Sequence, residues 1–249
     1  MKLPVQTIKF ACTITWLLTS LISTQPILLA ISALPKPPKT GTPKGNSTPG
    51  GTRPESTCKE TNKPLTALIA NNGSDFTLSQ YPNFWFYIPY APEDISYMEF
   101  SLLDGRERRT IYRTGIKLTE RPGVIKITIP SEQKYSLKPN ETYRWYFMLH
   151  CNPNKTGESD KVVDGWVQRK SMNLNLKNQL ESVKSQEYVA YSANGIWYDA
   201  VNNLATLHFD HPGNPEFNTG WANLLKYLGK DSVVQEPLVP SVLLSPKSN

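Results

Sequence analysis

One group of side chains in the sequence has the residue types of a metal site. His208-Phe209-Asp210-His211 brings two imidazoles and one carboxylate close together, and zinc accepts both ligand types. Residues at a helix end are more often solvated or capping, and the helix dipole favours histidine at a C-terminus. The acids Glu158, Asp160 and Asp164 lack the spacing of a calcium loop. We therefore expect no metal and no cofactor.

The short fingerprints of catalysis are missing from the sequence. It contains no Gly-x-Ser-x-Gly, no phosphate-binding loop, no His-Glu-x-x-His and no dinucleotide signature. A hydrolase with an unrecognised carboxylate pair is a remote alternative, because the separation of such a pair is set in space and not along the chain. We expect a protein that is not an enzyme and has no catalytic residues.

Aromatic residues supply a second kind of chemistry. If they were exposed, Trp85, Tyr87, Tyr146 and Trp166 would form a platform for stacking sugars, so a glycan-binding module is one alternative. The other interpretation is a core, since each large ring buries ~150–250 Å² and a buried area is worth ~25 cal/mol per Å². We expect a structural aromatic core made of Phe84, Trp85, Phe86, Tyr87, Trp145, Phe147, Trp166, Trp197 and Trp221.

A predicted hairpin carries a cluster of arginines. Asp104-Gly105 is a strong turn signal between two strands, and the cluster follows it: Arg106, Arg108, Arg109 and Arg113. These side chains are a candidate contact surface for another protein. Charge at the edge of a sheet also discourages unwanted strand pairing, and the sequence supports both interpretations.

Charge and cysteine content narrow the class of protein. The formal net charge is +6, but five of these charges fall within the first 55 residues, so the rest is nearly neutral. A nucleic-acid binder would have a basic body, and we expect no nucleic-acid partner. Cys58 and Cys151 are the only cysteines after residue 33, and in an oxidising compartment such a pair predicts a disulfide.

The first part of the chain resembles an export signal followed by a spacer. Residues 1–33 have a basic start, an apolar run over Phe10–Ile22 and small residues at the end, which predicts a cleaved signal peptide. The alternative is an uncleaved anchor that extends to Leu29. Residues 34–57 are rich in Pro, Gly, Ser and Thr and predict a flexible linker. The mature protein is then periplasmic, in the outer envelope or extracellular, without further membrane contact.

The segment 58–173 alternates short strands with turns. We expect strands over 65–69, 76–78, 84–88, 97–103, 110–118, 124–129, 142–151 and 162–170. Such spacing without a helical period is typical of an antiparallel immunoglobulin-like or fibronectin-like β-sandwich. Residues alternate between the faces of a strand, yet both faces of Phe84–Ile88 are apolar, so this strand needs a cover on each side.

A helical period follows in residues 174–232. Gly195 and Gly229 are 34 residues apart, the period of a tetratricopeptide repeat, and about one and a half repeats fit. Because so few repeats do not bury their apolar faces alone, we expect this part to dock on the sandwich and cover Trp85 and Tyr87. Residues 233–249 are expected to be a C-terminal tail. The predicted fold class is therefore α+β.

Several aromatic blocks are similar to a family of exported cyanobacterial proteins catalogued as a domain of unknown function, number nine-twenty-eight. They lie at 50–53, 65–68, 84–90, 112–114, 143–147, 165–169, 194–200 and 236–239. The resemblance implies a cyanobacterial envelope or secreted protein and brings no activity or catalytic residues. The pair Arg108-Arg109 makes the hairpin more basic than the family pattern. We predict a non-enzymatic interaction module whose partner is an envelope or secreted protein.

Overall fold

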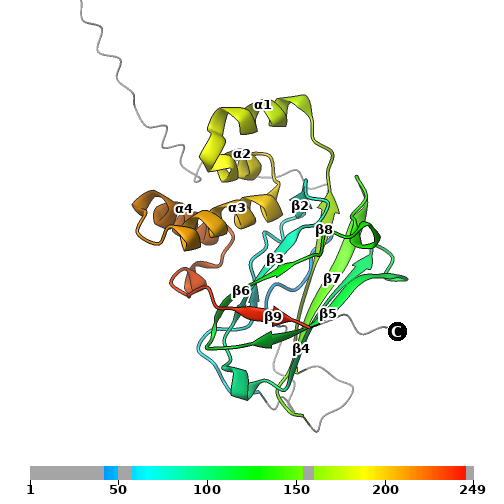
Figure 1. Cartoon of the computed structure of the whole chain (residues 1–249), viewed down its shortest axis with the longest axis vertical. Coiled ribbons are helices and arrows are strands. Elements are labelled where there is room, and N and C mark those ends of the chain that lie inside the picture. The colour runs from blue at the N-terminus through cyan, green and yellow to red at the C-terminus, as the bar shows by residue number, and fades with distance from the viewer. Residues whose placement is uncertain (1–41, 50–57, 154–159, 245–249) are drawn as a thin grey trace, which may run out of the picture.

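The computed structural model describes residues 42–49, 58–153 and 160–244, which form a mixed α+β fold as predicted. One sheet has the order β1-β3-β6 and the other β2-β8-β7-β4-β5-β9 (Figure 1). The strands are β1 (Thr66–Ala67), β2 (Phe76–Thr77), β3 (Asn83–Ile88), β4 (Tyr97–Asp104), β5 (Thr110–Leu118), β6 (Gly123–Thr128), β7 (Thr142–His150), β8 (Lys161–Arg169) and β9 (Ser241–Leu243).

The helices follow the strands in the chain. They are α1 (Leu174–Val183), α2 (Glu187–Ala193), α3 (Trp197–Asp210) and α4 (Pro215–Tyr227). Asn214 caps α4, because its side-chain oxygen accepts the N–H groups of Glu216 and Phe217, and Pro215 suits the first turn. Gly195 has φ 72°, a conformation that glycine adopts without strain, and this residue lets the chain turn from α2 into α3.

The two sheets pack face to face around the larger core. Phe84, Phe86 and Ile88 of β3 point into this core, where β7 supplies Trp145 and Phe147. The ring centroid of Phe86 lies 4.5 Å from that of Phe147 and 5.4 Å from that of Trp145. These five side chains are buried, as expected from the alternation of the two strands.

Helices cover the opposite face of β3. Trp85 and Tyr87 belong to a second core together with Trp197 of α3 and Trp221 of α4. All four side chains are at most 5% exposed, and the Trp85 ring is stacked with Phe209 at a centroid distance of 6.1 Å. Figure 1 shows α3 and α4 beside β3 and β6. The prediction that the helical part docks over Trp85 and Tyr87 is confirmed.

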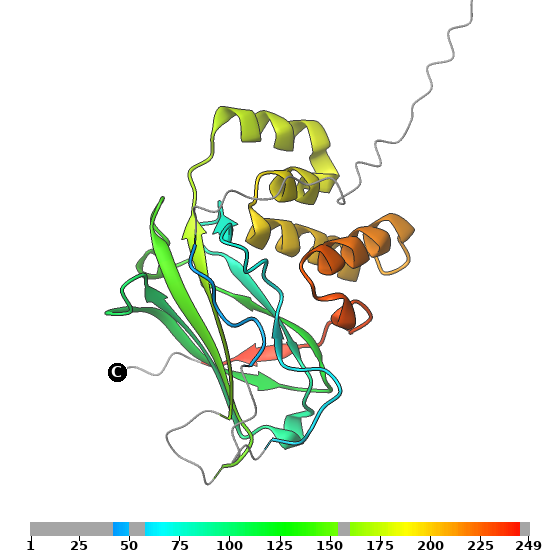
Figure 2. The same ribbon diagram turned by 180° about the vertical axis from the view of Figure 1, so that it is seen from behind.

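An N-terminal segment crosses between the two sheets, and the prediction of a flexible linker is wrong for residues 42–49. The N–H of Ala67 in β1 donates to the carbonyl of Ser47 at 2.8 Å, and the N–H of Asp164 in β8 donates to that of Asn46 at 2.9 Å. Figure 2 shows this segment running along the strands. Its composition resembles a linker, but its backbone pairs with two sheet edges, which holds it in place.

The last described residues cross between the two sheets at the other side. Val239 donates to the carbonyl of Val124 in β6 at 2.9 Å, after which β9 pairs with β5. The predicted tail 233–249 is therefore wrong up to residue 244, since this segment closes the seam between the sheets. The predicted signal peptide 1–33, the remaining linker residues and residues 245–249 lie outside the described part of the chain.

Two other expectations concern chain direction and covalent links. β2 runs parallel to β8, so the expected antiparallel arrangement is wrong for this pair. The two strands are not joined by a tight hairpin, which would require them to be antiparallel, because β3 to β7 lie between them in the chain. The predicted disulfide Cys58–Cys151 is present and ties the segment before β1 to the end of β7.

Among the described residues, no helix has the length and apolar character to cross a membrane.

Two buried acids lie beside β2. The backbone of Asp75 forms an isolated β-bridge with Ile196, whereas its carboxylate accepts hydrogen bonds from the Thr42 hydroxyl at 3.1 Å and from the Asn71 N–H at 2.8 Å. The carboxylate of Asp199 in α3 accepts the N–H of Leu78 at 3.1 Å. Burial raises the pKa of Asp75 to about 6, and hydrogen bonds that favour the charged form oppose this shift only in part. Burial likewise raises the pKa of Asp199 to about 6. The contacts of α3 with β2, through Asp199, and of Thr42 with the segment before β2, through Asp75, are therefore sensitive to pH.

We predict that Trp85→Ala lowers the free energy of unfolding by about 3–5 kcal/mol, the usual range for a buried tryptophan. The ring lies between β3 and α3, and its Nε1 donates to Asn202 at 3.3 Å. Trp166→Ala is the matched control, because Trp166 is only half-buried and lies on the outward face of the large sheet. Urea unfolding measures the loss in the free energy of unfolding for each variant, and we expect the smaller loss in Trp166→Ala. Equal losses in the two variants would contradict the two-core arrangement.

We predict that the protein loses stability as the pH rises from about 4 to about 6. The ordinary pKa of an aspartate is 3.8, so the native state holds more protons than the unfolded chain in this window. Each raised pKa is worth about 3 kcal/mol. Urea unfolding at several pH values measures this decrease in the free energy of unfolding. In Asp199→Asn the decrease between pH 4 and pH 6 should be smaller by about 3 kcal/mol. Asp210→Asn, at the exposed end of the same helix, is the control and should show the same decrease as the wild type. An unchanged fall in Asp199→Asn contradicts this account.

Candidate functional site

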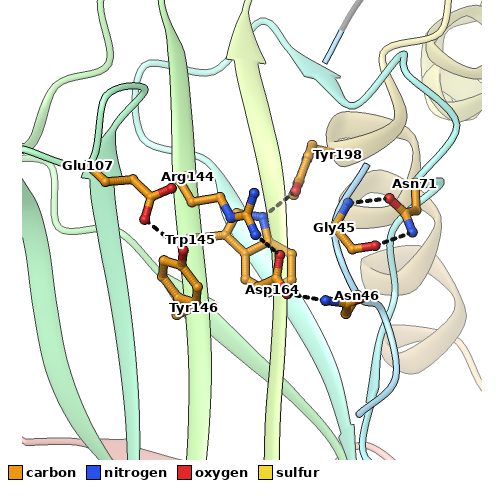
Figure 3. A network of polar contacts seen from close by, with 9 residues as sticks. All are labelled: Gly45, Asn46, Asn71, Glu107, Arg144, Trp145, Tyr146, Asp164 and Tyr198. Carbon is orange, nitrogen blue, oxygen red and sulfur yellow. Dashed lines mark hydrogen bonds and ion pairs between the residues drawn. The ribbon is translucent and has the colours of Figure 1, made fainter. Parts of the chain in front are cut away.

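The outward face of the large sheet carries an ion pair at its centre. Arg144 of β7 and Asp164 of β8 are joined through Nη2 and Oδ2, and their side chains are 17% and 6% exposed. The other carboxylate oxygen of Asp164 accepts a hydrogen bond from Asn46 Nδ2 at 2.9 Å (Figure 3). Asn46 belongs to the N-terminal crossing segment, so three distant parts of the chain meet at this ion pair.

Two aromatic rings accompany the guanidinium. The Cζ of Arg144 lies 4.7 Å from the ring centroid of Trp166 and 5.2 Å from that of Tyr146, which are distances of cation–π contacts. The register of the two strands places Arg144 opposite Trp166 and Tyr146 opposite Asp164. The four side chains therefore form a compact group on one face of β7 and β8.

The loop between β4 and β5 touches this group, and we call its residues 104–109 the hairpin tip. Tyr146 donates its hydroxyl hydrogen to Glu107 Oε2 at 2.7 Å (Figure 3). The Asp104 carboxylate accepts the N–H groups of Arg106 and Arg108 at 3.2 and 3.0 Å. The hydrogen bond from the Arg108 N–H is the main cause that lowers the pKa of Asp104. The tip is a defined structure that carries charge.

The four predicted arginines occupy two environments. Arg106, Arg108 and Arg109 are exposed at the hairpin tip and form no ion pair within the described part of the chain. Arg113 lies instead on the sheet, where its Nε is 3.3 Å from Glu99 Oε1. Only three of the four predicted arginines therefore lie together on the exposed tip.

Further hydrogen bonds hold the strands and the crossing segment that carry the site. The Nε1 of Trp145 donates to the hydroxyl of Tyr198 at 2.7 Å, and this hydroxyl donates to the carbonyl of Trp166 at 2.9 Å. Asn71 and Gly45 exchange two hydrogen bonds of 2.8 and 2.9 Å, which fix the segment that carries Asn46. A Cβ at Gly45 would lie 2.3 Å from the carbonyl oxygen of Asp164, so this position requires glycine.

The predicted aromatic platform is divided by the fold. Trp85 and Tyr87 are buried beneath the helices, whereas Tyr146 and Trp166 remain half-buried on the outward face. The assignment of Trp166 to the core is therefore wrong, because the alternation of β8 turns its ring outward. The other eight predicted core residues are buried.

The two histidines of the His208–His211 group have other partners in the structure. His208 Nδ1 is hydrogen-bonded to Asn218 Oδ1 at 2.7 Å, and His211 packs against Phe217 at a centroid distance of 5.8 Å. Burial lowers the pKa of His208. The group of potential ligands found among the described residues is Cys58, Cys151 and Asp160, and its two sulfurs form the disulfide. Glu158 lies outside the described residues.

The sequence pattern does not identify the central residues of the site. Arg144 falls within the predicted strand 142–151 and Asp164 within 162–170, and a signal for their common face is present in the sequence. Arg144 and Tyr146 are two residues apart, as are Asp164 and Trp166, which is the period of one strand face. Their pairing across β7 and β8 required the strand register, which the sequence pattern did not supply.

We predict that Arg144→Met lowers the free energy of unfolding by about 3 kcal/mol, because it leaves the nearly buried Asp164 carboxylate without its ion-pair partner. The double variant Arg144→Met/Asp164→Asn should recover much of this loss, since no unpaired charge remains. Arg113→Met is the control at a more exposed ion pair and should change stability by less than about 1 kcal/mol. A double variant less stable than Arg144→Met in urea unfolding argues against this explanation.

Comparison with protein families confirms the resemblance found in the sequence. Residues 48–238 match the Domain of Unknown Function (DUF928). The matched range includes the four helices and every described strand except β9. No match was found among curated proteins or among solved structures. Because the match spans most of the sequence, the chain belongs to the DUF928 family.

Proposed function

We propose that the chain is a non-enzymatic interaction module that binds an envelope or secreted protein through the hairpin tip. The observation that carries this proposal is the group of three exposed arginines, none of which is neutralised by an ion pair to the described residues. Arginine binds carboxylates through two parallel hydrogen bonds and is enriched at protein interfaces. The partner therefore presents acidic groups.

A role without catalysis is supported by how the outward face uses its acids. Asp164 is occupied by Arg144 and Asn46, and Glu107 by Tyr146. The two acids with strongly raised pKa values are also engaged: the Asp75 carboxylate accepts hydrogen bonds from Thr42 and Asn71, and that of Asp199 from Leu78. These carboxyl groups serve structural contacts, which favours binding over a carboxylate-pair hydrolase. Glycan binding is the weaker alternative, since two of its four aromatic rings are buried.

Export is part of the proposal and rests on two features. The first 33 residues have the composition of a signal peptide, and a disulfide such as Cys58–Cys151 persists in an oxidising compartment. We place the mature protein in the periplasm, the outer envelope or the medium. A cyanobacterial origin belongs to the same proposal and is supported by the sequence motifs alone.

The finer description of the fold is also proposed. Two sheets that pack around a shared core and a strand rich in aromatic residues are consistent with an immunoglobulin-like sandwich. A tetratricopeptide-like repeat is supported by Gly195 and Gly229, which lie 34 residues apart. Their φ angles are 72° and 69°, so both positions have the same unusual backbone conformation. Repeats of this kind bury their faces against neighbours, here the β3 sheet.

Affinity capture tests the proposed function. The mature chain is immobilised and exposed to envelope extract from its source cells, and the captured proteins are identified by mass spectrometry. We expect the variant Arg106→Ser/Arg108→Ser/Arg109→Ser to capture at least about tenfold less of the specific partner than the wild type does, because the charged contacts are removed. The control variant Lys117→Ser/Arg121→Ser/Lys226→Ser removes the same charge elsewhere and should retain the partner. Equal recovery with both variants rejects the tip as the contact surface.

A further inference from the structure

Two acidic side chains, those of Asp104 and Glu107, belong to the hairpin tip, and Glu107 lies among its arginines. Arg106, Arg108 and Arg109 are exposed, and Glu107 lies between the first two in the sequence. Glu107 forms no ion pair with a described arginine and accepts a hydrogen bond from Tyr146, at 2.7 Å. The Asp104 carboxylate is thus engaged by backbone N–H groups of the tip, and that of Glu107 by Tyr146 of the sheet.

The backbone of the tip fixes this arrangement. Glu107 has φ 56°, a left-handed conformation that is uncommon for residues other than glycine. Its N–H donates to the carbonyl of Asp104 at 2.8 Å, and the Asp104 side chain holds the N–H groups of Arg106 and Arg108. Strained residues of this kind persist where surrounding contacts determine them and often mark functional sites. In this conformation the Glu107 carboxylate accepts the hydrogen bond from Tyr146.

We propose that Tyr146 holds Glu107 against the sheet and thereby keeps Arg106, Arg108 and Arg109 available for an acidic segment of a partner protein. This inference rests on the function proposed above. A glutamate released from Tyr146 would lie beside arginines on the same loop and compete with the carboxylates of the partner. Tyr146 is then a positioning residue, which acts on binding through Glu107.

The outward face favours acidic protein over acidic glycan as the partner. Arg144 and Arg113 are both already bound to carboxylates, those of Asp164 and Glu99, so the carboxylate is the group that arginines of this face bind. The rings of Tyr146 and Trp166 already lie in cation–π contact with Arg144. They therefore offer less free surface to a sugar, while the tip arginines remain unpaired among the described residues.

A double-mutant cycle tests the role of Tyr146. Binding of a fluorescent oligoglutamate peptide is measured by anisotropy at low ionic strength, where exposed charges are little screened. We expect Tyr146→Phe to weaken binding about threefold or more, although it removes no charge, and Glu107→Gln to strengthen it. In the Glu107→Gln background, Tyr146→Phe should have no effect, because the competing carboxylate is gone. Equal effects of Tyr146→Phe in both backgrounds overturn the proposal.

Controls separate this inference from the proposed function. Tyr97→Phe is the matched variant, since Tyr97 donates to Glu99 at 2.8 Å on the same face, and it should leave peptide affinity unchanged. If Arg106→Ser/Arg108→Ser/Arg109→Ser weakens binding but Tyr146→Phe does not, only the role of Tyr146 is rejected. If the triple variant binds the peptide as well as the wild type, both proposals are rejected.

Two further measurements complete the test. Alginate, a polyuronate, is compared with the peptide at equal carboxylate concentration, and tighter binding of alginate overturns the assignment of an acidic protein partner. Circular dichroism establishes that each variant is folded. If Tyr146→Phe does not fold, the test uses Glu107→Gln alone, since Glu107 is exposed and its replacement does not disturb the core. A peptide affinity of Glu107→Gln no higher than that of the wild type then overturns the proposal.

Discussion

The structure depends on a strand that is apolar on both faces. β3 sends Phe84 and Phe86 into the core between the sheets and Trp85 and Tyr87 into the core beneath the helices. At ~25 cal/mol per Å², exposing a ring the size of Trp85 to water would forgo several kcal/mol. The small sheet therefore cannot stand without the helical layer. The helices in turn bury Trp197 and Trp221 on that sheet, so the two parts stabilise each other.

Both ends of the described chain strengthen this stack by crossing its open sides. Residues 42–49 pair with β1 and β8, and residues 237–243 pair with β6 and β5. Each crossing satisfies backbone groups that would otherwise be left at a sheet edge, where unpaired strands invite aggregation. The disulfide Cys58–Cys151 adds a covalent link between the start of the sandwich and β7. Helices, sheets and crossing segments thus share one continuous set of contacts.

The outward face of the large sheet is the face that neither the small sheet nor the helices cover. Most of its charged groups have a partner. Arg144 and Arg113 form ion pairs with Asp164 and Glu99, and Glu107 accepts a hydrogen bond from Tyr146. Within the described residues of this face, the tip arginines are the exception. Unpaired positive charge on a loop that hydrogen bonds hold in shape is suited to recognition, since little entropy is lost when a partner binds. This distribution of charge links the fold to the proposed function.

Local patterns in the sequence predicted most of the strands and helices, because alternation and helical period act over a few residues. The helical period predicted from residue 174 onwards begins with α1, and the strand predicted over 110–118 is β5. The apolar character of both faces of β3 also predicted the cover of helices. In contrast, the composition of residues 42–49 predicted a flexible linker, because composition reports on the isolated segment and not on the sheet edges that its backbone meets.

The sequence by itself determined the element types, the disulfide partners, the need for two cores and the presence of a basic hairpin. Only the tertiary structure decided which arginines remain unpaired and which residue restrains Glu107. The ion pair of Arg144 with Asp164 spans 20 residues, the bond of Asn46 with Asp164 spans 118, and that of Tyr146 with Glu107 spans 39. Such contacts depend on strand register and on the paths of crossing segments, and these follow from the packing of the whole chain.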